Sequence, residues 1–426
     1  MTVVSTTGKS TFREGAYGAL TSARRCGFPT IRLTAQSAGC PRVTVVQRVI
    51  IVGGGLAGFE AARALRTQEY SGELIMLAAE DEPPYDRPPL SKDFLMGRDP
   101  HIHFDLGPIA DLELRLGQSA LRLAEGQVET ADETLSADGI ILAVGADAIQ
   151  LPGTTTLRTH DDARKLHEQL YAGASVAVIG AGWIGAEVAF AAAEAGCIVT
   201  VYEALNSPLA AALPSELGML TVPWYEQVGI ELRLGERVAD VAALGADVVV
   251  AGLGARPATG WLRDSAVELR DNDGAVVVDE FMRTKVEGVV AAGDCAAWWS
   301  KRYDKRMRVE HWDTALHAPA VAASSLLSDD GDPYDPVPYF WSDQFGHNLQ
   351  FAGHKSDDDR IVVRGDTSDA SWGVGWFNTE AELTAFLTVD HPRDLTQARR
   401  AMAGRSRFDL DLFADPATAV KQAVLT

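Results

Sequence analysis

The feature that most constrains this chain is a glycine pattern, G-x-G-x-x-G, that occurs twice in the same local context. In the first copy the glycines are Gly53, Gly55 and Gly58. A β-rich run at 49–52 precedes them, and an Ala-rich stretch at 56–65 with helical spacing separates them from a second β run at 73–78. This order predicts a strand, a tight turn, a helix and a parallel strand, which together form a βαβ unit.

Each glycine of such a unit has its own physical role. The first permits the tight turn, the second lets the backbone approach a pyrophosphate, and the third lets the helix pack closely on the sheet. Leu56 and Ala57 complete the turn, whose helix N-terminus favours phosphate charge. Glu80 follows Gly58 by 22 residues, where a carboxylate can bind a ribose hydroxyl. The context favours a dinucleotide site over glycines that serve only a turn.

The second copy consists of Gly180, Gly182 and Gly185, with Trp183 and Ile184 between the last two. A β run at 175–179, a helix at 184–195 and a strand at 198–203 are predicted around it. Glu203 ends that strand, and its carboxylate accepts a bond from an unmodified ribose 2′-hydroxyl but repels a 2′-phosphate. Since residues 204–208 contain no arginine, NADH is favoured over NADPH.

A third segment, 288–296, places Gly293 and Asp294 at the end of a buried β run. Alone it could be an ordinary strand-ending turn. Together with two upstream glycine units, it predicts a carboxylate close to a bound nucleotide, and the two units predict two dinucleotides.

Charge and cysteine content narrow the class of protein further. A formal charge of −21 argues against nucleic acid or an anionic membrane surface as a partner. No apolar run approaches the roughly 20 residues of a membrane-spanning helix. The cysteines form neither a C-x-x-C pair nor a metal-ligand cluster, so we expect no metal and a reducing, cytoplasmic compartment; they are Cys26, Cys40, Cys197 and Cys295.

Several longer segments resemble one known family. They are Tyr85-Asp-Arg-Pro-Pro-Leu-Ser-Lys92, Trp183-Ile-Gly-Ala-Glu187, Gly293-Asp-Cys295, Glu310-His-Trp-Asp313, Phe340-Trp-Ser-Asp-Gln-Phe-Gly-His347 and His391-Pro-Arg-Asp394. About residues 47 to 405 resemble the two-dinucleotide flavoproteins of the glutathione-reductase superfamily. Within it, they resemble most the NADH-dependent, putidaredoxin reductase-like ferredoxin reductases that serve bacterial Rieske oxygenases and haem monooxygenases.

The resemblance implies that the first glycine unit, with Glu80 and Asp294, holds FAD, and that the second, with Glu203, holds NADH. The family's flavin-side lysine corresponds to Lys92 and its nicotinamide-side glutamate to Glu187, the two expected catalytic residues. An ammonium there can stabilise negative charge on the reduced flavin, and the carboxylate can hold the lysine. The alternative is a surface lysine and a glutamate on a helix face.

By the same resemblance, other side chains and backbone positions contact the cofactors. His311 and Trp312 are expected at the pyrimidine edge of the flavin, and Trp341 against the ring system. Without the family, a tryptophan in an aromatic strand is more often core. The remaining expected cofactor-binding residues are Arg87, Gly145 and Gly254.

The fold class implied is α/β, with two Rossmann-like domains and a C-terminal α+β domain. The implied domains are an N-terminal extension at 1–46, a discontinuous FAD-binding domain at 47–153 and 255–331, an NAD-binding domain at 154–254, and a C-terminal domain at 332–426. In the last, β runs are expected at 339–351, 361–363 and 372–377 and a helix at 395–402. We expect the extension to be disordered; its basic, acid-poor composition also suits a transit peptide, and translation beginning near Val43 is a third reading.

The segment 87–92 contains no cysteine, whereas disulfide-reducing relatives carry a thiol pair next to the flavin. Electrons must therefore leave the flavin directly, which suits an iron–sulfur acceptor. The scattered cysteines match no cluster spacing, so the acceptor is expected to be a separate ferredoxin. A basic island precedes the segment 310–313 and is either part of the docking face for an acidic ferredoxin or a solvated loop; it consists of Lys301, Arg302, Lys305, Arg306 and Arg308.

Alternative functions on the same scaffold are a rubredoxin reductase, an NADH oxidase or a monodehydroascorbate reductase. Peroxide-handling oxidases need a flavin-facing cysteine, where this chain has Ser91 and Lys92. A non-catalytic flavoprotein resembling apoptosis-inducing factor is a further alternative, opposed by the strongly acidic charge. One departure from the family is the absence of arginines in 204–214, which bears on the choice of nicotinamide cofactor.

Overall fold

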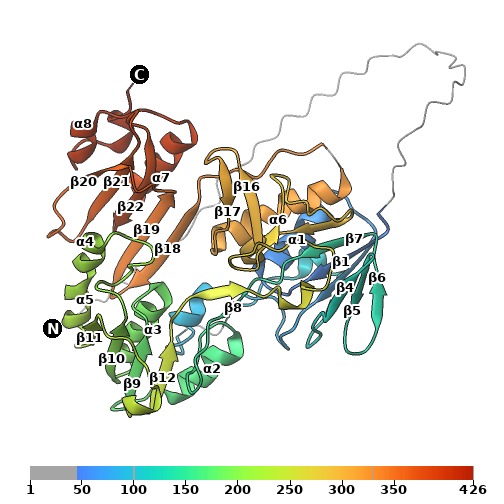
Figure 1. Cartoon of the computed structure of the whole chain (residues 1–426), viewed down its shortest axis with the longest axis horizontal. Coiled ribbons are helices and arrows are strands. Elements are labelled where there is room, and N and C mark those ends of the chain that lie inside the picture. Colours follow the sequence, from blue (N-terminus) through green and yellow to red (C-terminus); the bar gives the residue numbers. More distant parts are fainter. Residues whose placement is uncertain (1–45, 99–100, 329, 426) are drawn as a thin grey trace, which may run out of the picture. The chain divides into compact units, whose positions relative to one another are not determined.

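A computed structural model describes residues 46–98, 101–328 and 330–425 (Figure 1). The N-terminal extension at 1–46, which is predicted to be disordered, lies outside the described residues except for Val46. The folded part contains two parallel sheets, of five and four strands, and a five-stranded antiparallel sheet, as the predicted fold class requires. Limits of the individual domains, residue by residue, remain a prediction.

The first parallel sheet is built on the first glycine unit. Its strand order is β15-β7-β1-β2-β3, and every neighbouring pair is parallel. β1 is buried over its last four residues, as expected for a strand covered on both faces. The strands are β1 (Arg48–Val52), β2 (Glu73–Leu77), β3 (Glu113–Arg115), β7 (Gly139–Leu142) and β15 (Val289–Ala291).

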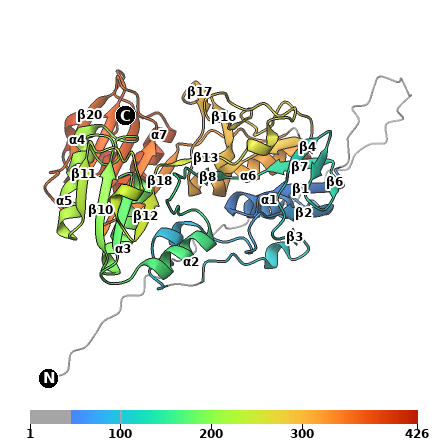
Figure 2. The same cartoon turned by 60° about the horizontal axis from the view of Figure 1, so that its bottom comes forward.

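Two helices pack side by side against this sheet. α1 (Leu56–Thr67) joins β1 to β2, close to the predicted helix at 56–65. α6 (Trp312–Leu327) comes from much later in the sequence and lies alongside α1, as both views show (Figure 2). Together with β15, α6 shows that the chain returns to the first sheet after completing the second.

The second parallel sheet repeats the arrangement around the second glycine unit. Its order is β11-β10-β9-β12, and its pairs are all parallel. The strands are β9 (Ser175–Ile179), β10 (Ile198–Glu203), β11 (Glu231–Leu234) and β12 (Val248–Ala251). The helices are α2 (His160–Gln169), α3 (Trp183–Glu194), α4 (Ser215–Gly218) and α5 (Val222–Gln227). The predicted β9, α3 and β10 are confirmed, with a shift of one residue at each end of the helix.

Short antiparallel strands complete this region. β8 (Ala146–Ala148) pairs with β13 (Ala255–Pro257), so the chain leaves and re-enters the first sheet's region through one two-stranded ribbon. The others are β4 (Arg122–Ala124), β5 (Gln127–Glu129), β6 (Thr134–Ser136), β14 (Val276–Val277), β16 (Ala296–Ser300) and β17 (Lys305–Met307).

The C-terminal antiparallel sheet has the order β18-β19-β22-β21-β20. Its strands are β18 (Tyr339–Gln344), β19 (His347–Gly353), β20 (Arg360–Arg364), β21 (Trp372–Phe377) and β22 (Leu383–Val389), and its helices are α7 (Pro392–Ala403) and α8 (Leu410–Ala414). The predicted run at 339–351 is two strands, because Phe345 and Gly346 form a turn of positive φ. β22 was not predicted, although it is the central strand and almost wholly buried. Its short apolar run carries no alternation that would separate a strand from a core helix.

Within the described ranges, no helix is both long enough and apolar enough to cross a bilayer.

Candidate functional site

The first glycine turn has the geometry that a dinucleotide cradle needs. Gly53 has φ +121°, and a Cβ there would lie 2.2 Å from the carbonyl oxygen of Ala143. A Cβ on Gly58 would lie 2.0 Å from the carbonyl oxygen of Gly53. In contrast, a Cβ on Gly55 would meet nothing closer than Arg87 at 4.0 Å, so the space before the helix is open. The first and third glycines are thus required by packing, and the second borders free space.

The N-terminus of α1 offers its amides to that space. Gly55 is its N-cap, no side chain caps the helix, and the first turn carries no acid. Leu56 and Ala57 follow directly, as predicted for the binding turn. Uncapped N–H groups and the positive end of the helix dipole suit a pyrophosphate. These residues fit the diphosphate of FAD.

Glu80 lies just beyond the end of β2, at the position predicted for ribose binding. Its carboxylate accepts bonds from the Tyr85 hydroxyl (2.6 Å) and from the Arg87 guanidinium (2.6 Å). Burial raises the pKa of the Tyr85 phenol, which therefore stays protonated as a donor. Its oxygen also accepts the backbone N–H of His160 at 2.8 Å. Glu80 is thus oriented by residues that also hold the segment entering α2.

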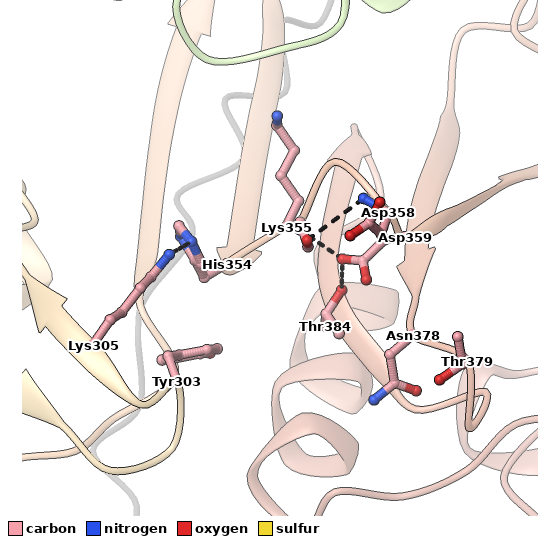
Figure 3. A pocket seen from close by; sticks show the side chains of 10 residues that line it. Tyr303, Lys305, His354, Lys355, Asp358, Asp359, Asn378, Thr379 and Thr384 are labelled. Atoms are coloured by element: carbon pink, nitrogen blue, oxygen red, sulfur yellow. Dashed lines mark hydrogen bonds between the residues drawn. The ribbon is translucent and has the colours of Figure 1, made fainter.

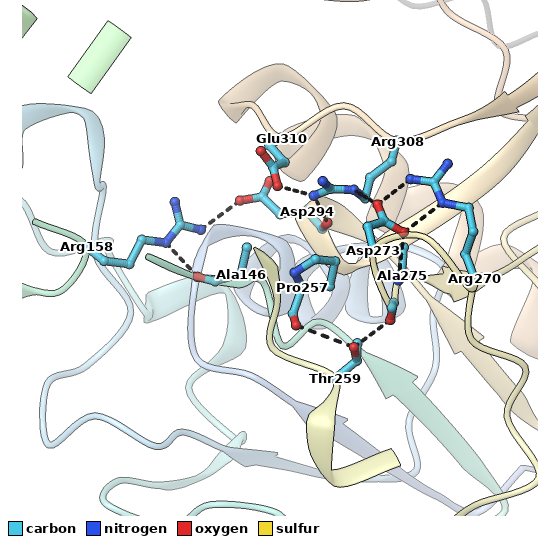
Figure 4. Close-up of polar contacts among 11 residues, drawn as sticks. Ala146, Arg158, Pro257, Thr259, Arg270, Asp273, Ala275, Asp294, Arg308 and Glu310 are labelled. Atoms are coloured by element: carbon cyan, nitrogen blue, oxygen red, sulfur yellow. Dashed lines mark hydrogen bonds and ion pairs between the residues drawn. The ribbon is translucent and has the colours of Figure 1, made fainter. Parts of the chain in front are cut away.

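Sequence reasoning missed Arg158, which lies in that segment. Its guanidinium bonds Asp294 at 2.7 Å and the carbonyl of Ala146 at 2.9 Å (Figure 4). Gly145 adjoins it with φ +67°, and Gly293 begins the 3-10 turn that presents Asp294. An isolated arginine ahead of a capping threonine gave no signal, because its partner lies 136 positions away.

Three predicted aromatic residues meet at the start of α6 and on β18. The ring of His311 lies 4.9 Å from that of Trp341, and Trp341 lies 5.6 Å from Trp312. The indole N–H of Trp312 donates to Asp86 at 2.9 Å. Trp341 thus lies against the two residues expected at the flavin, and its own contact with the ring system stays a prediction.

His311 is neutral and has an unused polar atom. Burial lowers its pKa to about 4. Its Nε2 lies 3.3 Å from both the backbone nitrogen and oxygen of Trp341, while its Nδ1 is buried and has no partner among the described residues. An orphaned buried nitrogen beside an open cradle fits a site shaped for a polar ring edge.

The second glycine turn repeats these features. Gly180 has φ +102°, and a Cβ on Gly185 would lie 2.0 Å from the Gly180 carbonyl oxygen. Gly182 caps α3 without a side-chain bond, and its own Cβ would meet nothing within 3.8 Å. Ile184 is 44% exposed at this turn, where a bound nucleotide would cover it. Gly254 lies beyond β12 with φ +93°.

Glu203 closes the second site from the end of β10. One carboxylate oxygen accepts the backbone N–H of Ala181 and the other that of Leu205, both at 2.8 Å. These bonds turn the carboxylate toward the glycine turn. Its position suits recognition of an unmodified ribose, as predicted for NADH.

The two expected catalytic residues form an ion pair. The ammonium of Lys92 lies 2.8 Å from a carboxylate oxygen of Glu187. The Lys92 side chain is 22% exposed and that of Glu187 only 4%. Lys92 is therefore not an isolated surface lysine, and the catalytic roles of the two residues stay a prediction. The pair joins the segment that follows β2 to the helix that follows the second glycine turn.

Most cations of the basic island are bonded to other parts of the protein. Arg302 donates to the carbonyls of Met402 and Ala403, and Arg306 to those of Val278 and Ala297. Arg308 pairs with Asp273 at 2.7 Å, and Lys301 with Glu280 at 2.9 Å. These cations therefore hold the protein's own loops, and the role of the island in docking a ferredoxin stays a prediction.

Lys305, the remaining cation of the island, lines a pocket of about 450 Å³. Its ammonium contacts the imidazole of His354 there (Figure 3). The pocket also carries Lys355, Asp358 and Asp359. Its charges balance, and neither glycine turn lines it. It is therefore separate from the two dinucleotide sites.

Two glycine-turn cradles and a shared Lys–Glu pair define an oxidoreductase of the two-dinucleotide class. The profile of the pyridine nucleotide-disulphide oxidoreductase family matches residues 47–318, and that of the reductase C-terminal domain matches residues 339–424. The chain belongs to the pyridine nucleotide-disulphide oxidoreductase family. The predicted cofactors, FAD and NAD(H), are those of the family.

Relatives and solved structures agree with this assignment. The chain is 33% identical over 404 residues to the anthranilate 1,2-dioxygenase system ferredoxin–NAD(+) reductase component of Burkholderia cepacia, covering 87% of this chain and 98% of that one. It is also 33% identical to rhodocoxin reductase of Rhodococcus erythropolis, covering 88% and 94%. The covalent putidaredoxin reductase–putidaredoxin complex matches with TM-score 0.83, 27% identity, and coverage of 89% and 98%. The predicted resemblance to ferredoxin reductases is confirmed.

Proposed function

We propose that this protein is an FAD-dependent reductase that oxidises NADH and passes the electrons to a separate iron–sulfur ferredoxin of an oxygenase system. The observation that carries the proposal is the Lys92–Glu187 pair, set between two dinucleotide cradles with no thiol in the flavin-side segment 87–92. The names of the relatives support the same activity, because the Burkholderia cepacia protein is a ferredoxin reductase component of a dioxygenase system.

The residues that would hold FAD are the amides of α1, Glu80 and the Arg158–Asp294 pair. Those that would hold NADH are the amides of α3 and Glu203. Bound FAD supplies a ring that accepts a hydride from NADH and can release the electrons one at a time. Lys92 places a positive charge where negative charge develops, and Glu187 keeps that ammonium in position. His311, neutral at pH 7, offers an imidazole nitrogen without adding charge.

The described thiols are unsuited to a disulfide relay. Cys295 is wholly buried, and its Sγ donates to the carbonyls of Leu142 and Ala292. Burial raises its pKa to about 12, so the reactive thiolate is scarce. Burial also raises the pKa of Cys197. The raised pKa values of these thiols favour direct electron transfer from the flavin over transfer through a disulfide.

A reducing, cytoplasmic location is part of the proposal. It rests on the cysteine usage of the whole sequence, which contains no C-x-x-C pair.

The test is electron transfer by the FAD-reconstituted protein. NADH and the reductase are mixed without oxygen with a [2Fe–2S] ferredoxin from an anthranilate dioxygenase system, from a benzene dioxygenase system, or with putidaredoxin, and bleaching of the iron–sulfur absorbance is followed. We expect at least one ferredoxin to be reduced at a rate that saturates with its concentration. A Cys295→Ala variant serves as the control and should match the parent. Reduction of an aromatic disulfide by NADH, with none of the three ferredoxins reduced, would contradict the proposal.

A further inference from the structure

The carboxylate of Glu187 is bound by two separate parts of the chain. Glu187 itself is on α3, which follows the second glycine turn. One carboxylate oxygen, Oε2, accepts bonds from Lys92 (2.8 Å) and from the hydroxyl of Ser91, both next to the first cradle. The other, Oε1, accepts the hydroxyl of Ser342 at 2.6 Å and the backbone N–H of Asp343 at 3.2 Å. Each oxygen is therefore held by a different region, and Oε1 is held by the C-terminal antiparallel sheet.

The alternation of β18 explains how one strand serves two purposes. Side chains of successive strand residues point to opposite faces. Phe340 and Ser342 face α3, where the ring of Phe340 lies 4.9 Å from that of Trp183. Trp341, between them, faces His311 and Trp312. The strand that presents Trp341 to the expected flavin site thus also presents Ser342 to Glu187.

The hydroxyl group of Ser342 donates its hydrogen to Glu187. The side-chain amide of Gln344 donates to Ser342 Oγ at 3.1 Å, so that oxygen already acts as an acceptor. Its own hydrogen is then free for the carboxylate. Both residues are 1% exposed, so water does not compete. A hydroxyl fixed in this way to a buried carboxylate makes a stronger bond than a neutral surface pair does.

We propose that Ser342 is a positioning residue for Lys92, acting through Glu187. The C-terminal sheet orients one oxygen of the carboxylate, and the other oxygen then holds the Lys92 ammonium in the place from which it acts on the flavin ring. Ser91 assists on the oxygen shared with Lys92. The C-terminal sheet therefore helps set the electrostatics of the hydride-transfer site, in addition to presenting Trp341. This inference rests on the proposed function.

The decisive variant is Ser342→Ala, compared with Ser342→Thr, which keeps the hydroxyl. In the FAD-loaded protein, Ser342→Ala is expected to lower the rate constant of flavin reduction by NADH roughly tenfold, the effect of losing one bond to a charged group. The KM for NADH should change little, because the cradle amides and Glu203 are untouched. The midpoint potential of the flavin should become more negative, because the ammonium stabilises the reduced, anionic ring less well. Ser342→Thr should restore both quantities.

A matched control comes from the same sheet. Thr388, on β22, is fully buried, and its hydroxyl has no partner among the described residues. Thr388→Val therefore removes a buried hydroxyl without touching Glu187, and it should leave the potential unchanged. Should Ser342→Ala fail to fold, the nearly isosteric Ser342→Cys, a much weaker donor, decides in its place.

The outcomes separate this inference from the proposed function. If the parent protein reduces its flavin with NADH but Ser342→Ala has an unchanged potential and rate constant, Ser342 has no positioning role and only the inference is lost. The same conclusion follows if Thr388→Val shifts the potential as much as Ser342→Ala. If the parent protein takes up FAD and is not reduced by NADH, the proposed function itself fails.

Discussion

Lys92 and Glu187 are 95 positions apart in the sequence, yet the Lys92 ammonium lies 2.8 Å from the Glu187 carboxylate. Lys92 follows the 3-10 turn Pro88–Ser91, and Glu187 lies in the second turn of α3. Each residue therefore belongs to one of the two dinucleotide units. The pair joins the two units, at the point where the proposed function requires a nicotinamide to meet a flavin.

Removing the lysine alone should destabilise the fold as well as slow the reaction. Lys92→Met leaves a carboxylate that is 4% exposed without its cation, and breaking a buried pair costs about 3 to 5 kcal/mol. The bonds from Ser91 and Ser342 remain, so we expect a loss near the lower limit. Urea unfolding should show that the double variant Lys92→Met, Glu187→Gln is more stable than Lys92→Met alone. Equal stability of the two variants would show that the charges are not coupled.

Glu203 should determine the choice between NADH and NADPH. Glu203→Ser removes the charge that repels a 2′-phosphate, and we expect the ratio of kcat/KM values for the two cofactors to fall at least tenfold, or about 1.4 kcal/mol. Glu231→Ser, on the neighbouring strand and paired with Arg233 at the surface, is the control and should leave the ratio unchanged. A ratio that stays constant in Glu203→Ser would contradict the assignment of the second site.

Arg158 should contribute to FAD retention. Arg158→Met breaks the 2.7 Å pair with Asp294, and the resulting loss of one charged hydrogen bond corresponds to roughly tenfold or more in the dissociation constant of FAD. The dissociation constant is measured by the quenching of flavin fluorescence. Arg164→Met removes an exposed arginine paired with Asp161 and Glu168 on α2, and it should have no such effect.

His311 should make the protein less stable in mild acid. Burial lowers its pKa in the folded state from 6.5 to about 4, so between these values the unfolded state binds more protons. The contribution of neutral His311 to the free energy of unfolding is fully present above pH 6.5. It is lost as the pH falls toward 4, by at most about 3 kcal/mol. His311→Gln, which cannot be protonated, should lose less stability than the parent between pH 6.5 and 4.5. If urea unfolding shows that the parent and His311→Gln lose the same stability over this pH range, His311 is not the group responsible.

The sequence predicted those parts of the molecule that depend on local chemistry. Gly53 and Gly58 are required because a Cβ would collide with the backbone of Ala143 and of Gly53. The collision at Gly58 arises within one turn, so the glycine spacing reports it, whereas the collision at Gly53 involves a strand end 90 positions away. The strands and helices of both units were predicted for the same reason. Resemblance to a family added the expected roles of Lys92, Glu187 and Trp341, which no local pattern indicates.

The sequence did not predict contacts between distant segments. Arg302 and Arg306 were interpreted as surface cations, yet they donate to backbone carbonyls of the protein. Arg158 was overlooked because Asp294 lies 136 positions away. β22 was overlooked because an apolar run of seven residues does not reveal which strands will flank it.

By itself, then, the sequence determined that the chain forms two βαβ units with open, uncapped helix ends, because backbone sterics and hydrophobic spacing act over a few residues. Only the tertiary structure decided which charges meet and what holds them. Glu187 is bonded by Ser91, Lys92 and Ser342, and these partners come from segments that approach one another only when separate sheets pack. Hydrogen bonds act over about 3 Å, so their partners are defined by the packed geometry and not by the order of residues along the chain.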